Sequence, residues 1–151
     1  MVWEMNNKKS LDKIGGLLEK VATKSLPFLN QCSETKLLAY SDISQAHEKY
    51  RVLAKQAFSG SEEILSSRPN CRQGIESVQS ALKRKKLSSD LITALSDLRT
   101  SYLEEILRPA VKGYLTDGKT PRGNIEELYE KVFRLDGLID IGEFFKRVDS
   151  L

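Results

Sequence analysis

Apolar residues recur three or four positions apart along most of the chain, which is the spacing of one face of an α-helix. The first such run is expected to begin at Ser10 and to reach about Gln31, with Pro27 kinking or breaking its last turn. Its apolar positions are Leu11, Ile14, Leu18, Val21 and Phe28, interrupted by Ser25. No segment shows the strict alternation of a half-buried strand, so the pattern predicts an all-α fold.

The most regular pattern follows, in a helix expected to begin after Ser33 and to end near Ser66. Seven small or apolar residues alternate there at spacings of three and four, and we call them the heptad seam: Ile43, Ala46, Tyr50, Leu53, Ala57, Gly60 and Ile64. The small members allow a neighbouring helix to approach closely. Two interpretations stay open: an intramolecular hairpin or bundle, and an intermolecular coiled coil.

Two further helical runs follow the Arg68-Pro69 break. One begins at Asn70, and the other extends from Leu91 to about Ala110, where Pro109 is expected to disturb it. Two interpretations of the join stay open: a new helix capped by Ser88 or Ser89, and one helix that runs straight through. The predicted apolar faces are Ile75, Val78 and Leu82 in the first of these runs, and Leu91, Leu95, Leu98, Tyr102, Ile106 and Ala110 in the second.

The end of the chain predicts two short helices. Asn124 and Glu127 form a helix-start signature, Asp136-Gly137 is typical of a helix end, and Asp140 with Glu143 can start another helix. The expected apolar faces are Ile125, Leu128, Val132 and Leu135 in one helix, and Ile141, Phe144, Phe145, Val148 and Leu151 in the other.

These runs predict one helical domain over residues 1–151, with a flexible N-terminus at 1–9. A bundle of long helices would occupy residues 10–115, a loop 116–124, and a C-terminal helix pair 125–151. The predicted fold class is therefore an antiparallel helical bundle, or an elongated helical hairpin, that carries a short C-terminal helix pair.

Composition narrows the class of protein. The chain of 151 residues is 40% apolar and 30% charged, enough for a core, and its net charge of +3 dictates no partner. No stretch reaches the length of a membrane span, and the start lacks the features of a secretory signal.

Cys32 and Cys71 are expected to be reduced, as in a cytoplasmic protein; a disulfide that joins two helices is the alternative.

Residues 113–120 read GYLTDGKT and match the phosphate-loop pattern G-x-x-x-x-G-K-[ST]. A phosphate loop works because a buried strand delivers its glycine-rich turn to the start of a helix. Here the preceding residues are helix-periodic and include Pro109. The sequence therefore predicts an exposed loop and no nucleotide.

Residues 136–144 read DGLIDIGEF, which resembles the second half of an EF-hand calcium loop. In that resemblance Asp136, Asp140 and Glu143 would supply oxygen ligands. Val132 and Arg134 stand where the first half of the loop needs carboxylates, so the ligand set is incomplete. We therefore expect a helix–turn–helix corner there, and neither a metal nor a cofactor in this chain.

A basic run occupies Lys83, Arg84, Lys85 and Lys86. Four consecutive residues turn most of the way around a helix, so they form a collar, which suits a helix end where cations meet the negative end of the dipole. The functional alternative is a contact with the phosphates of nucleic acid or of an acidic membrane surface.

No group of residues predicts catalysis. The single histidine, His47, has no histidine or cysteine at ligand spacing, and adjacent glutamates point apart on a helix. The sequence therefore predicts a non-catalytic scaffold or adaptor that binds other proteins, a second copy of itself included, and no small-molecule substrate. The expected partner-binding residues are Ile43, Tyr50, Leu53, Ile64, Phe144 and Phe145; the alternative is an accessory subunit that contacts phosphates through residues 83–86.

Overall fold

The computed structural model describes residues 2–57, 62–84, 89–116 and 122–150, and all its elements in these ranges are helical. The all-α prediction is therefore confirmed for this part of the chain. In order, the elements are α1 (Val2–Gln31), α2 (Glu34–Leu38), α3 (Ile43–Gln56), α4 (Glu62–Ser66), α5 (Pro69–Leu82), α6 (Ser89–Tyr102), the π-helical turn η1 (Leu103–Leu107), α7 (Arg108–Thr116) and α8 (Arg122–Asp149).

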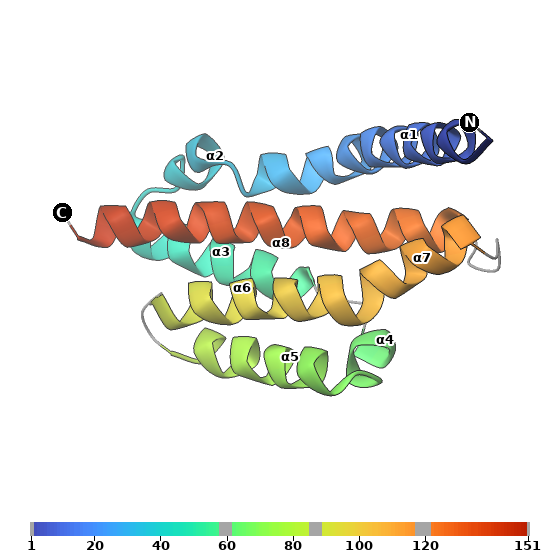
Figure 1. Cartoon of the computed structure of the whole chain (residues 1–151). Coiled ribbons are helices and arrows are strands. Elements are labelled where there is room, and N and C mark those ends of the chain that lie inside the picture. Colours follow the sequence, from blue (N-terminus) through green and yellow to red (C-terminus); the bar gives the residue numbers. More distant parts are fainter. Residues whose placement is uncertain (1, 58–61, 85–88, 117–121, 151) are drawn as a thin grey trace.

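Helix α8 lies at the centre, with α1 along one side of it and α6 along the other (Figure 1). Helix α5 packs on the far side of α6 (Figure 1). Along α6, Ile92 lies over Gly142 and Arg99 pairs with Asp136, so α6 and α8 run in opposite directions. The expected antiparallel packing of helices is therefore present.

Helix α1 instead runs parallel to α8. Lys24 pairs with Glu126 at 3.1 Å near the start of α8, and further along both helices the Arg134 guanidinium lies 5.1 Å from the centre of the Phe28 ring. A cation over an aromatic face is attracted by the ring quadrupole. These contacts and a buried apolar stripe hold α1 against α8.

Pro27 does not end α1, which begins at Val2 and runs to Gln31. Proline removes one backbone hydrogen bond, but the turns on both sides of it are held by packing, because Val21 and Ser25 are fully buried and Phe28 packs against the core. The predicted interruption at Ser25 is therefore part of the buried face. The flexibility expected of residues 1–9 stays a prediction.

The helix expected from Ser33 to Ser66 is divided into three. The Ser33 side chain accepts a hydrogen bond from the Lys36 amide and caps the short α2, and Asp42 accepts one from the Gln45 amide and caps α3. Each cap satisfies a backbone N–H that a helix start leaves unpaired. The Asp42 cap, which the sequence analysis missed, places the start of α3 at Ile43.

The C-terminal helix pair predicted for residues 125–151 is wrong, since α8 is one continuous helix through Asp136 and Gly137. Gly137 serves as a point of close approach and not as a helix end: a Cβ there would meet the end of the Leu29 side chain of α1. The glycine leaves room for the Leu29 side chain where α1 packs on α8, and it does not terminate the helix.

The disturbance predicted at Pro109 takes the form of the π-helical turn η1, directly before α7. A wider turn there relieves the clash between the proline ring and the carbonyl group one turn earlier. The same turn presents the Glu105 carboxylate to the Cys71 amide, which donates a hydrogen bond to it at 2.9 Å. Glu105 thus caps the start of α5, where Arg68 provides no side-chain cap.

Candidate functional site

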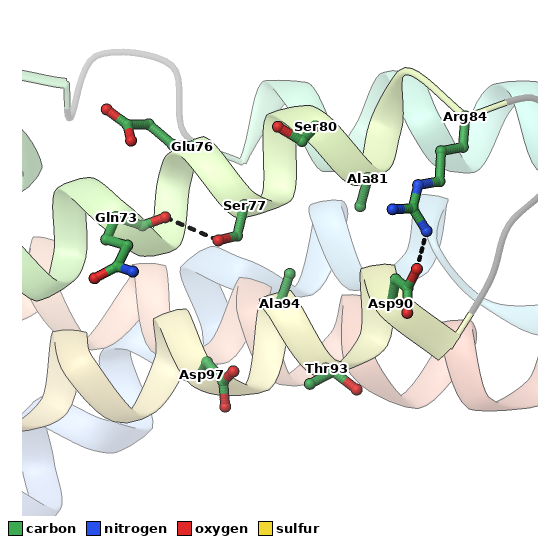
Figure 2. A pocket seen from close by; sticks show the side chains of 10 residues that line it. All are labelled: Gln73, Glu76, Ser77, Ser80, Ala81, Arg84, Asp90, Thr93, Ala94 and Asp97. Atoms are coloured by element: carbon green, nitrogen blue, oxygen red, sulfur yellow. Dashed lines mark hydrogen bonds and ion pairs between the residues drawn. The ribbon is translucent and has the colours of Figure 1, made fainter.

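Two of the surface grooves formed by the described residues are large enough to hold a ligand or a partner's side chains. The polar groove lies between α5 and α6 and has a volume of about 550 Å³ (Figure 2). The apolar groove lies between η1, α7 and α8 and has a volume of about 510 Å³. Ligand sites are more often apolar hollows with a few polar groups than polar seams. The residues that line each groove therefore indicate which of the two is the better candidate for a binding site.

The polar groove is a seam in which three of the lining side chains, Arg84, Asp90 and Ser77, pair within the chain. Figure 2 shows Arg84 paired with Asp90 at one end, and the Ser77 hydroxyl donating to the Gln73 carbonyl at 3.0 Å. Glu76 and Asp97 point apart in the same view and do not converge on a common point. The groove therefore offers no cluster of oxygen ligands for a cation.

The walls of the apolar groove come mostly from one helix and its π-helical turn. Along α7, two rows of residues spaced four apart lie side by side, because residues four apart occupy one face of a helix. One row is apolar and consists of Leu103, Leu107, Val111 and Leu115. The other is polar and consists of Arg108, Lys112 and Thr116, and Tyr129 of α8 forms the facing wall.

Burial decreases along the apolar row from Leu107 to Leu115. Leu107 is 5% exposed and belongs to the core, Val111 is half-buried, and Leu115 is 41% exposed at the end of α7. Tyr129 closes the opposite side, and its burial raises the pKa of its phenol. Apolar surface therefore continues from the core into solvent, which is a feature of surfaces that another molecule covers.

The residues of the heptad seam lie mostly in the intramolecular core. Tyr50 and Leu53 are fully buried, and the Tyr50 hydroxyl donates to the Leu138 carbonyl of α8. Ile43 is 37% exposed, and Ile64 lies in α4, with its side chain outside the described residues. In this conformation a partner cannot contact Tyr50 or Leu53.

The two phenylalanines expected to bind a partner differ in burial. Phe145 is fully buried and Phe144 is half-buried, with ring centres 5.7 Å apart. His47 meets Phe145 edge-on at 4.6 Å, and its Nε2 lies 3.5 Å from an Asp149 carboxylate oxygen. Burial lowers the pKa of His47, while Asp149 raises it and Arg51 lowers it. This histidine is thus packed at the edge of the core.

The described part of the basic run lies at a helix end. Lys83 is the C-cap of α5 and is exposed, and Arg84 pairs with Asp90 of α6; Lys85 and Lys86 lie outside the described residues. A cation at the end of a helix is favoured by its dipole. The contact with phosphates stays a prediction.

The two motif-like strings lie on helices where the structure describes them. Residues 113–116 form the last turn of α7, whereas residues 117–120 of the phosphate-loop string lie outside the described residues. Residues 136–144 lie within α8, so the EF-hand resemblance does not extend to a loop. Within the described ranges, no three histidine, cysteine or acidic side chains come together as a metal site, and no helix combines the length and apolar character that spanning a bilayer requires.

Both cysteines are buried and unpaired. Burial raises the pKa of the Cys32 thiol from 9.0 to about 11. Burial, reinforced by a hydrogen bond to Glu105, raises the pKa of Cys71 from 9.0 to about 12. The reduced thiols expected from the sequence are thus held protonated in the folded chain, which disfavours the reactive thiolate.

The free energy of unfolding is expected to decrease as the pH rises above 9.0, the pKa of an unperturbed thiol. Below that pH both states keep their thiol protons, whereas above it the unfolded chain loses them first. Urea unfolding on either side of this value measures the decrease. A variant with Cys32→Ala and Cys71→Ala should show a smaller decrease, and an equal one would contradict the assignment.

No protein-family model, curated protein or solved structure matches this chain. Of the two grooves, the apolar one is the stronger candidate site, because it joins exposed apolar side chains to cationic ones. The sequence analysis missed it, although the spacing of Leu103, Leu107, Val111 and Leu115 is visible in the sequence. These four lie on a different face of the run from its predicted core positions.

Proposed function

We propose that this chain is a non-catalytic helical interaction module that binds another protein through the apolar groove. The observation that carries the proposal is the row of apolar side chains along α7, which starts in the core at Leu107 and ends in solvent at Leu115. A helix laid in such a groove would bury this row, as in the common helix-in-groove mode of recognition.

The chemistry of the groove favours binding over catalysis. Its lining holds no histidine, cysteine or carboxylate, so a nucleophile and a base that could activate it are not paired there. Its apolar residues and Tyr129 are of the kind that contribute most to protein interfaces. The scaffold or adaptor role predicted from the heptad seam is thus proposed here for a different surface.

The other exposed large apolar side chains support this choice of surface. Within the described residues they lie on α1, on α2 and the segment after it, and on α3: Leu26, Leu38, Tyr40, Ile43 and Val52. None of them lines either of the two large grooves. Single exposed apolar residues are normal on a protein surface, whereas a hollow lined by several of them is not.

Substitution of Leu115 by Glu is expected to abolish capture of a protein partner from native lysate, because it places a charge in the groove. Leu26→Glu provides the matched control: Leu26 is 52% exposed and Leu115 is 41% exposed, so neither change should unfold the chain. The measurement is affinity capture with both variants and the wild-type chain, with nuclease, at low and moderate salt.

Loss of the same protein with Leu115→Glu and its retention with Leu26→Glu would support the proposal. Equal capture by all three chains would contradict it. If nucleic acid or lipid is captured in its place, and salt removes it, the function moves to residues 83–86, since phosphate contacts weaken steeply with ionic strength.

A further inference from the structure

We infer that the apolar groove binds an amphipathic helix of another protein that carries acidic residues beside its apolar face. The inference rests on the proposed function and names the chemistry of the partner. It is carried by the two cations on the rim of the groove, Arg108 and Lys112, and by the straight row of apolar side chains next to them.

The shape of the groove fits a helix. The lining of α7 and η1 extends from Leu103 to Thr116, which corresponds to about 20 Å of helix at about 1.5 Å per residue. Residues spaced four apart form a ridge on a helix, and ridges of a second helix pack into the grooves beside it. An elongated, open hollow of this kind matches about four turns of a partner helix.

The charge on the rim selects the partner. Arg108 and Lys112 are both exposed, and no ion pair joins either of them to another residue that the structure describes. Four other arginines of the fold are paired within the chain: Arg51, Arg84, Arg99 and Arg134. The lining of the groove holds no carboxylate, so its two cations are left for a partner's anions.

The spacing of the cations distinguishes a helix from a fatty acid. Arg108 and Lys112 are four residues apart and so lie one turn apart on the same face of α7. Two carboxylates one turn apart on a partner helix match both cations, whereas a fatty acid carries a single carboxylate. The apolar row provides most of the affinity, and the charge pairs provide orientation and specificity, because exposed ion pairs contribute little by themselves.

The test uses two labelled synthetic peptides of about 18 residues, a length at which an amphipathic helix can form. Both carry leucines along one face; one has glutamates beside this face and the other has lysines. Fluorescence anisotropy at low salt measures their affinities for the wild-type chain. The glutamate peptide is expected to bind at least about tenfold more tightly than the lysine peptide.

Reversal of the rim charges provides the internal check. A variant with Arg108→Glu and Lys112→Glu is expected to prefer the lysine peptide. A variant with Lys55→Glu and Lys83→Glu, which changes the net charge equally at exposed helix ends away from the groove, should keep the preference for the glutamate peptide. Leu115→Glu should weaken binding of both peptides.

The acidic partner would be overturned if the wild-type and charge-reversed chains each bind both peptides equally and Leu115→Glu removes this binding. The proposed function would then still stand. Failure of both peptides to bind, with lysate capture independent of Leu115, would overturn both. If the chain binds a fluorescent fatty acid but neither peptide, and Leu115→Glu removes this binding, the groove is a fatty-acid site and the acidic helix is overturned. If the chain instead dimerises and Leu115→Glu prevents it, the occupant is a second copy of the chain, and the acidic helix is again overturned.

Discussion

A Leu53→Asp variant is expected to be largely unfolded at room temperature. Leu53 is fully buried, so the change leaves a cavity and places a carboxylate where water does not reach. Loss of a buried leucine alone costs about 2.7–5 kcal/mol, and burial of an unpaired charge adds several more. The sum approaches the whole stability of a domain, about 5–15 kcal/mol. Far-ultraviolet circular dichroism and urea unfolding measure the effect.

Val52→Asp is the matched control, because Val52 precedes Leu53 on α3 and is 38% exposed. It should change the free energy of unfolding by about 0.5 kcal/mol or less. The comparison also tests the heptad seam. If Leu53→Asp stays folded as a monomer and the wild-type chain is an oligomer, the seam is intermolecular and the burial of Leu53 within one chain is wrong.

A Gly142→Leu variant is expected to lose about 2–4 kcal/mol of stability through overpacking and one lost hydrogen bond. A Cβ at Gly142 would lie 2.9 Å from the Tyr50 hydroxyl oxygen and 3.1 Å from Ile92. Leu138 lies one turn earlier on α8, so a side chain at position 142 would also cover the Leu138 carbonyl, which accepts the hydrogen bond from Tyr50. Urea unfolding measures the loss.

Gly123→Leu is the control for this prediction. Gly123 lies in the same helix, but a Cβ there would meet no atom of the described residues within 4 Å. Because leucine is the better helix former, the control should be neutral or stabilised by up to about 1 kcal/mol. A similar loss of stability in both variants would show that the close approach of α3 and α6 to α8 is not what requires glycine at position 142.

Much of the helical pattern could be predicted from the sequence. Leu91, Leu95, Leu98, Tyr102 and Ile106 were expected on one face, and all are buried in the structure. Ile125, Leu128, Val132 and Leu135 were expected on another, and they are buried too. These predictions succeed because apolar residues that recur with the helical period of 3.6 residues form one stripe on the helix surface, and an amphipathic helix buries that stripe.

The predicted break of α8 at Asp136-Gly137 is wrong for a physical reason, although Ile141 and Phe145 of the predicted last face are buried as expected. A helix with neighbours on several sides needs apolar residues on several faces, so its pattern no longer shows a single stripe. Gly137 then resembles a helix end, although it lies where the Leu29 side chain of α1 approaches α8. Whether a glycine ends a helix or admits a neighbour depends on contacts with residues far away in the sequence.

The candidate site could not be predicted for a related reason. Tyr50 and Leu53 form a regular pattern, but a regular apolar pattern is equally typical of a core and of an interface. Leu115 lies outside the predicted core face, and its role depends on the position of Tyr129 across the groove. Likewise, the cap that Glu105 provides for α5 depends on a π-helical turn that no local pattern announces.

The central position of α8 also has a consequence for biosynthesis. Among the described elements, α1, α3 and α6 pack on α8 and precede it in the chain, so the ribosome completes them before the surface they share has been made. Lys24 and Glu126 are 102 positions apart, and contacts over such separations form after local ones. The nascent chain therefore carries uncovered apolar faces while α7 is being made, and this is the stage at which chaperones would meet it.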